Sequence, residues 1–180
     1  MQRCDLYLII CNKTYTMDTV TNNPYEDFPF TITRTFLGQL HIECPGTPEL
    51  ILYPTEKTFA VIIKTEVLSA RISKDLYYMI EIKVNISTAI DSGLKAHELM
   101  FVYVVFVNIN DESLDSESIH KILNDTIPKS KFNDINSIVF NATNATGYPI
   151  VLDKKQFEES IIDKGTSESD EEEPVGSINN

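Results

Sequence analysis

The chain has 180 residues, a formal net charge of −12 and 42 % hydrophobic residues. This length and composition indicate one globular domain that can bury a sizeable core. An acidic chain repels the phosphate backbone, so the charge argues against nucleic-acid binding. No apolar run approaches the roughly eighteen residues of a transmembrane helix, and no signal-peptide pattern opens the chain. We therefore expect a cytoplasmic protein that does not insert into a membrane.

The first part of the chain alternates strand-like stretches with turn-rich segments. Residues 3–16 predict a strand, and with the polar loop that follows they form an N-terminal extension over residues 1–30. Residues 31–43 predict the first strand of the core domain, which we expect to span 31–163. Between residues 44 and 54, three prolines and a glycine favour an ordered crossover or loop.

Three more strands are expected at residues 58–72, 75–90 and 98–109. Apolar residues fall on even positions of 75–90 and polar residues mostly on odd ones, which is typical of a strand with one buried face. The strand at 98–109 is apolar on both faces, so it is either covered by two layers or contacts a subunit or ligand. One face carries Leu99, Phe101, Tyr103, Val105 and Val107, and the other carries Met100, Val102, Val104 and Phe106.

The apolar spacing then changes from two to three and four, which is typical of helices. Residues 111–128 predict a helix whose acids and serines suit an N-terminus and which Pro128 ends. Residues 129–146 predict an amphipathic helix that stops at Gly147-Tyr148-Pro149.

A last short helix is expected at residues 155–163, and residues 164–180 predict an acidic, disordered tail. Strands that precede helices along the chain indicate an α+β fold, with an antiparallel sheet and its helices on one face.

No motif indicates catalysis, a metal or a cofactor. The chain lacks a phosphate-binding glycine loop, a nucleophile elbow and a His-Glu-x-x-His pair. No metal-ligand spacing surrounds His41, His97 or His120, which we interpret as surface or edge residues. We expect a protein that is not an enzyme and binds no cofactor.

Acids and cysteines have plain explanations as well. The acidic cluster Asp111, Glu112, Asp115 and Glu117 lacks the alternating positions and central glycine of a calcium loop, so helix capping explains it better. The cysteines, Cys4, Cys11 and Cys44, are odd in number and include no Cys-x-x-Cys pair, which favours reduced thiols.

Three features follow one another in order over residues 34 to about 162. The first is a Glu-x-Pro-x-x-Pro motif at residues 43–48, directly after the first core strand. The second is Asp75-Leu76-Tyr77 at the start of the long alternating strand. The third is a helix from Pro128 to the stop at Pro149, followed by a short apolar segment and Phe157. In this order and spacing the three features resemble the bacterial export chaperone family SecB.

This resemblance implies a four-stranded or larger antiparallel sheet with a crossover after its first core strand, and assembly into a tetramer as a dimer of dimers. It also implies an ATP-independent holdase that binds unfolded or secretory polypeptides in apolar grooves for protein export and translocation. Two alternatives stay open: a SecB-like chaperone of an antitoxin in a toxin–antitoxin system, or a non-catalytic adaptor that binds one folded partner through the strand at 99–107.

The resemblance also suggests where partners bind. Clients are expected to bind at two apolar stretches, residues 50–53 and alternate residues of 100–106. For residues 50–53 the alternative is that they only cover the core. An acidic face docks the motor ATPase SecA in the family. Glu43 matches one of its acids, whereas Gln39 and Val102 stand where others are expected. The expected client-binding residues are Leu50, Ile51, Leu52, Tyr53, Met100, Val102, Val104 and Phe106.

Overall fold

The computed structural model describes residues 28–45, 59–73, 75–90, 93 and 95–168. The strand expected at residues 3–16 and the segment at 46–58, which includes most of the expected crossover, lie outside these residues.

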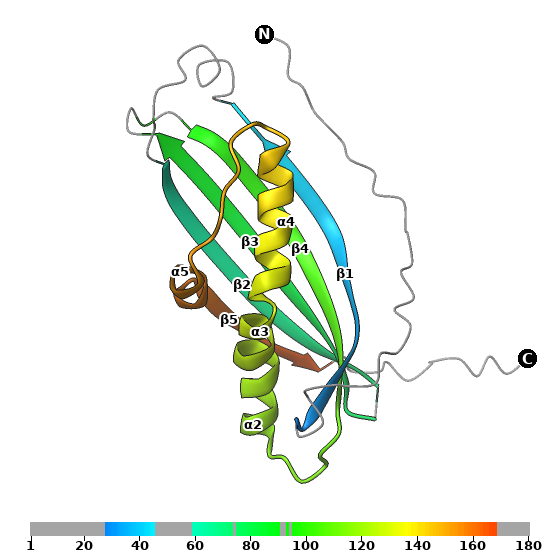
Figure 1. Cartoon of the computed structure of the whole chain (residues 1–180). Coiled ribbons are helices and arrows are strands. Elements are labelled where there is room, and N and C mark those ends of the chain that lie inside the picture. The colour runs from blue at the N-terminus through cyan, green and yellow to red at the C-terminus, as the bar shows by residue number, and fades with distance from the viewer. Residues whose placement is uncertain (1–27, 46–58, 74, 91–92, 94, 169–180) are drawn as a thin grey trace, which may run out of the picture.

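The described residues form one five-stranded sheet with the order β1-β4-β3-β2-β5 (Figure 1). Strands β1 to β4 pair antiparallel, and β5 pairs parallel to β2. Because β4 and β3 lie between β1 and β2, the connection between these two strands crosses the sheet, as expected. The strands are β1 (Phe30–Glu43), β2 (Phe59–Ser73), β3 (Tyr77–Ile90), β4 (Lys95–Ile109) and β5 (Ile161–Glu168).

The described helices lie on one face of the sheet (Figure 1), so the predicted α+β architecture is confirmed. None of them is long and apolar enough to cross a lipid bilayer. The helical elements are α2 (Ser116–Lys121), the π-helical turn η1 (Ile122–Thr126), α3 (Ile127–Ser130), α4 (Phe132–Asn144) and α5 (Lys154–Glu159).

The core lies between this layer of helices and the sheet. The even-numbered residues of β3 from Tyr78 to Ile86 are buried, as the period of two predicts. On β4 the odd-numbered residues from His97 to Ile109 are buried, and Ala96 and Val104 are buried as well. The helices close the core with Leu123, Ile127, Ile135, Val139 and Phe157.

Pro128 does not end a helix, contrary to the sequence-based prediction, because α2, η1 and α3 follow one another without a break through Ser130. A proline ring clashes with the carbonyl four residues earlier in a regular α-helix. The π-helical turn widens the backbone just before this point, where the Ile127 N–H donates to the Ile122 carbonyl. The widened turn therefore lets the helix continue past Pro128.

The last predicted helix is also shorter than expected, since α5 ends at Glu159 and β5 follows it. Residues 164–168, assigned to the tail by composition, belong to this strand. This mostly polar segment forms a strand because it pairs with backbone N–H and C=O groups along the outer edge of β2. Gly165 adopts a φ of 96°, next to the register shift between Val67 and Ser69 of β2.

The end of α4 matches the prediction. Gly147 has a φ of 84°, the left-handed conformation expected after a helix C-terminus. The chain then folds back, because the Ile150 N–H donates to Thr143 Oγ1 at 2.8 Å and the Leu152 N–H donates to Asn136 Oδ1 at 2.8 Å. Ile150 and Leu152 consequently pack into the core, while Val151 between them is 67 % exposed.

Candidate polypeptide-binding surfaces

An apolar stripe runs along β4 on the sheet face opposite the helices, which we call the open face. Phe36 of β1 lies directly across from Val104 and extends this stripe sideways. Val104 is buried, Met100, Val102 and Phe106 are half-buried, and Phe36 is 44 % exposed. We call this set the open-face stripe; its members are Phe36, Met100, Val102, Val104 and Phe106.

Aromatic rings form one end of the open-face stripe. The Phe106 ring stacks between Phe36 and Tyr77, with centroid distances of 5.9 Å to each. The Tyr77 hydroxyl lies 3.0 Å from Thr33 Oγ1, which itself lies 3.3 Å from the Phe106 carbonyl oxygen. Stacked rings with a tethered hydroxyl offer a firm apolar platform.

Three more exposed apolar residues lie on β2, and one of them is Ile72, which is 45 % exposed. Ile62 is 60 % exposed and Leu68 is 41 % exposed, while their neighbours Ile63 and Val67 are buried on the other face. Large side chains left exposed on one sheet face are unusual for a protein that works without a partner. The open face therefore carries apolar area on both β4 and β2.

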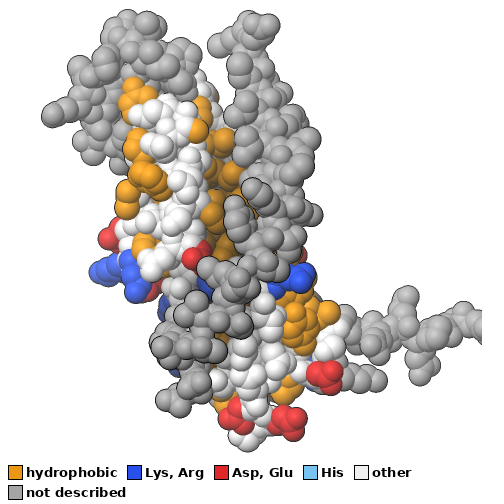
Figure 2. Space-filling view, turned by 45° about the vertical axis from the view of Figure 1, so that its right-hand side comes forward, with side chains coloured by type: hydrophobic (Ala, Val, Ile, Leu, Met, Phe, Trp, Pro, Cys, Tyr) orange, Lys and Arg blue, Asp and Glu red, His pale blue; other side chains and the backbone are white. Residues whose placement is uncertain are grey.

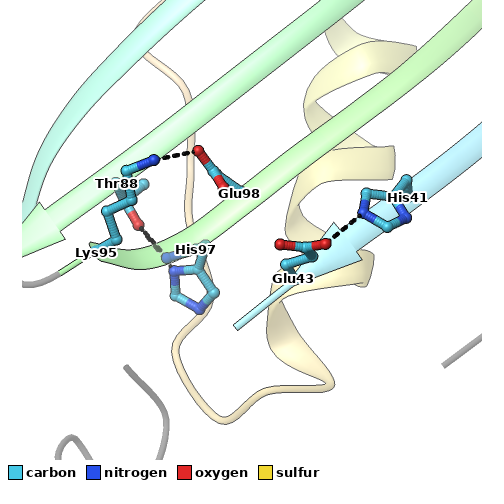
Figure 3. Close-up of polar contacts among 6 residues, drawn as sticks. All are labelled: His41, Glu43, Thr88, Lys95, His97 and Glu98. Carbon is cyan, nitrogen blue, oxygen red and sulfur yellow. Dashed lines mark hydrogen bonds and ion pairs between the residues drawn. The ribbon is translucent and has the colours of Figure 1, made fainter. Parts of the chain in front are cut away.

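Acids gather at the other end of the open face. Glu43 and Glu98 lie directly opposite each other across β1 and β4. Each has its own polar partner: His41 Nε2 lies 3.1 Å from Glu43 Oε1, and Lys95 Nζ lies 2.5 Å from Glu98 Oε1 (Figure 3). Like charges in direct opposition destabilise a strand pair, and the Lys95 ammonium offsets that repulsion.

A shallow depression of about 450 Å³ surrounds the same acids. Its floor mixes apolar and polar side chains, so it suits an amphipathic segment better than a compact charged ligand. Its lining residues are His41, Glu43, Ile62, Lys64, Asn85, Ile86, Ser87, Glu98, Leu99 and Met100.

A second apolar strip lies on the helix side, along β1. Its residues pack against the core but stay partly exposed, and hydrophobic side chains reach the surface beside the long helix α4 (Figure 2). Among the described strands, β1 lies at one edge of the sheet and pairs only with β4, whereas β3 and β4 each lie between two strands. The strip consists of Ile32, Leu37, Leu40 and Ile42.

His97 is a core residue rather than the surface or edge residue that we expected. It lies on β4, which begins at Lys95, and it is 1 % exposed. Its backbone N–H donates to Thr88 Oγ1 at 3.1 Å, and Nδ1 lies 2.9 Å from the same oxygen (Figure 3). On the other side, Nε2 lies 2.9 Å from Thr146 Oγ1. The sequence did not indicate this role because Thr146 is far from His97 along the chain.

These contacts suit a neutral imidazole. Thr146 Oγ1 donates to the Thr143 carbonyl at 2.6 Å, so it accepts the Nε2–H of His97. Thr88 Oγ1 accepts the backbone N–H of His97, so it donates to Nδ1. Burial lowers the pKa of His97 below its usual value of 6.5, which also favours the neutral imidazole. His97 thus ties the end of α4 to the sheet.

Tyr103 links the start of α4 to β4 in a similar way. Its hydroxyl donates to Asp134 Oδ2 at 3.1 Å. Burial, together with the nearby Asp134 carboxylate, raises the pKa of Tyr103 to about 12. The phenol therefore stays protonated and serves as a hydrogen-bond donor that positions the helix.

The acidic cluster after β4 caps a helix, as predicted. Asp115 is the N-cap of α2 and accepts the Ser118 N–H at 2.7 Å. Asp111 accepts the N–H and the hydroxyl of Ser113. These hydrogen bonds lower the pKa of both carboxyls. Among the described residues, no group of three or more His, Cys, Asp or Glu side chains could hold a metal ion.

The structure brings some of the predicted binding residues together. Met100, Val102, Val104 and Phe106 form the open-face stripe, whereas residues 50–53 lie outside the described residues. Glu43 meets Glu98, which the sequence analysis did not single out, and Gln39 lies opposite Val102. Phe36 was missed because the register shift between Leu37 and Gln39 interrupts the alternation of β1.

No protein-family model and no curated protein matches the chain. Among solved structures, it is similar to the SecB-like chaperone Rv1957 of Mycobacterium tuberculosis, in complex with a ChAD peptide from the antitoxin HigA1 (Rv1956). The two share 11 % identity and a TM-score of 0.53, over 69 % of this chain and 89 % of the other. A protein of unknown function from Streptococcus agalactiae has 13 % identity and a TM-score of 0.36, over 69 % and 96 % of the two chains. The likeness to Rv1957 shows that the chain has a SecB-like fold.

Proposed function

We propose that the protein is an ATP-independent chaperone that holds extended or unfolded polypeptides against the apolar surfaces of its sheet. The observation that carries this proposal is the open-face stripe, where Phe36 and its neighbours leave apolar area exposed on a SecB-like fold. Burial of such area drives association by about 25 cal/mol per Å² of apolar surface. Holding a client in this way requires neither a nucleotide nor a catalytic group.

The geometry of the stripe fits an extended client. Successive open-face positions of β4 are two residues apart, which spaces their side chains by roughly 6.5–7 Å along the strand. An extended polypeptide presents its own alternate side chains at the same spacing. A client that lies along β4 therefore matches the stripe over several residues, with little dependence on its sequence.

Aggregation assays test the proposal. Stoichiometric protein is expected to slow the aggregation of several unrelated unfolded clients without ATP. The variant Phe36→Ser/Phe106→Ser is expected to lose most of this activity, because both rings leave the stripe. Val151→Ser is the matched control, since Val151 is 67 % exposed away from the sheet. The proposal fails if the wild-type protein slows none of these clients.

The same variants separate a client site from a subunit interface. A SecB-like dimer of dimers is expected by size-exclusion light scattering. If Phe36→Ser/Phe106→Ser lowers the oligomeric state while capture persists, the open-face stripe is an interface between subunits or with one folded partner. In that case the open-face stripe is not the client site, and clients are held elsewhere on the protein.

An antitoxin chaperone is the second candidate function, and the peptide bound to Rv1957 favours it. The client is then one dedicated protein instead of many. Co-expression with an antitoxin encoded beside this gene is expected to protect that antitoxin from proteolysis. A gene neighbourhood without any toxin–antitoxin pair contradicts this candidate.

A role in export requires docking to SecA, for which Glu43 is the proposed contact. Glu98 lies across from Glu43 and doubles the local charge. Calorimetry with SecA measures the interaction, and Glu43→Gln/Glu98→Gln is expected to abolish it. If wild-type protein shows no binding, the chaperone acts outside the export route.

A further inference from the structure

The outer edge of β2 is occupied by β5, a strand whose side chains contribute little buried apolar area. β5 has two large apolar residues among its eight, and one of them, Ile162, is 48 % exposed. Asp163 and Lys164 are exposed as well. Backbone pairing with β2, from Thr65 to Arg71, therefore supplies most of the attachment.

Specific contacts concentrate at the first residues of β5. The Thr65 N–H donates to the Ser160 carbonyl at 3.2 Å, just before the strand begins. Ile161 packs against the core as its one partly buried apolar side chain. Asp163 Oδ2 lies 2.5 Å from His120 Nε2, on the helix α2. Two side chains of β5 thus have specific partners: the apolar Ile161 contacts the core, and the acidic Asp163, two residues later, contacts His120.

Beyond Asp163 the pairing is interrupted. The register shifts between Val67 and Ser69 of β2, and Gly165 has a φ of 96° at this place in β5. Lys164 reaches Glu66 only at 3.7 Å, between two half-exposed side chains, which is a weak surface interaction. The second half of the strand therefore adds little to specificity.

Backbone pairing at a sheet edge tolerates many sequences, and peptides use such edges by strand addition. We propose that the outer edge of β2, together with His120, is a binding site for extended polypeptides with an apolar–x–acid pattern. β5 is its displaceable internal occupant, which a polypeptide in trans replaces. The proposal rests on the proposed function in one respect, namely that the polypeptide that displaces β5 is a client of the chaperone. The edge site itself is distinct from the open-face stripe.

The first experiment weakens the internal strand in the full chain and offers the same strand in trans. The probe is a fluorescein-labelled peptide with the sequence of residues 158–168, EESIIDKGTSE. The Ile161→Ser/Asp163→Asn chain is expected to bind it about tenfold or more tightly than wild type, because the tethered competitor is weaker. Fluorescence anisotropy measures binding, and circular dichroism checks the fold. The same peptide with Asp163 replaced by Asn is expected to bind more weakly.

The second experiment locks β5 in place. Glu66 and Ile162 are directly opposite in the parallel pair, so Glu66→Cys/Ile162→Cys can form a disulfide once the three native cysteines are replaced by Ser. The oxidised chain is expected to bind no peptide, and reductant is expected to restore binding. Equal binding by oxidised and reduced chains overturns the proposal, as does no binding by the Ile161→Ser/Asp163→Asn chain.

A third measurement separates this proposal from the chaperone function. Phe36→Ser/Phe106→Ser, placed in the Ile161→Ser/Asp163→Asn chain, is expected to keep peptide binding. The same two open-face substitutions in the otherwise wild-type chain, where β5 occupies the edge, are expected to lose client holding. His120→Ala in the Ile161→Ser/Asp163→Asn chain is expected to lower the affinity for the peptide, because the Asp163 carboxylate loses its partner. If the open-face variant abolishes peptide binding instead, the peptide sits on the open face and the edge site is wrong.

Discussion

The two faces of the sheet differ in what their apolar residues do. On the helix-covered face, residues such as Ile80, Phe101 and Val105 are fully buried beneath α4 and its neighbours. On the open face, Phe36 and Ile62 leave about half of their surface exposed. One sheet thus carries stability on one side and a surface for association on the other. Substitutions on the covered face should therefore change folding, and those on the open face should change binding.

The largest effect on stability is expected for Phe101→Ala. Phe101 is fully buried on the covered face, and truncation of such a ring leaves a cavity that costs about 3–5 kcal/mol. Urea unfolding followed by circular dichroism measures the change. Phe106→Ala is the matched control, because Phe106 lies on the same strand but on the open face. Its loss of unfolding free energy should be clearly smaller. Equal losses for the two variants would show that the open face is packed as a core.

A smaller loss is expected for Thr143→Val, which tests how α4 is joined to the segment after it. Thr143 is fully buried, and its hydroxyl accepts the Ile150 N–H while donating to the Val139 carbonyl at 2.8 Å. Valine keeps the shape but leaves the Ile150 N–H without its partner, which costs about 1–3 kcal/mol. Thr143→Ser retains the hydroxyl and should recover much of the loss in the same urea titration.

The covered face should also respond to pH through His97. In the folded state burial lowers the pKa of His97, whereas the unfolded chain has the usual value near 6.5. Below that value the unfolded chain binds a proton that the folded chain excludes, so stability falls as the pH drops from 6.5 towards the folded pKa. His97→Gln removes this titration. The difference in unfolding free energy between the two proteins should therefore vary across this pH range and level off above it.

The sequence predicts which face of a strand a side chain lies on when alternate residues lie in the same surroundings along the whole strand. β4 is an example, since its two apolar faces could be assigned directly from alternate residues. The alternation of β3 worked for the same reason, because one face packs in the core and the other does not.

Elements that depend on distant backbone groups were not predictable in this way. β5 forms by pairing with the outer edge of β2, and nothing in the composition of residues 164–168 indicates a strand. The burial of His97 depends on Thr146, which α4 brings to the end of the sheet. Phe36 joined the stripe only through a register shift in β1. In each case the missing information was a pairing between segments far apart along the chain.

The smallest effect on stability, and a clear effect on binding, is expected for Phe36→Ser alone. Phe36 is 44 % exposed and contributes mainly its stacking on Phe106, so its loss should cost about 1 kcal/mol or less. Half of the ring nevertheless faces solvent beside Val104, where a client gains apolar contact. The variant should therefore unfold at nearly the wild-type urea concentration yet hold clients less well. A variant that loses stability as much as Phe101→Ala, or one that holds clients as wild type does, would remove the distinction between the two faces.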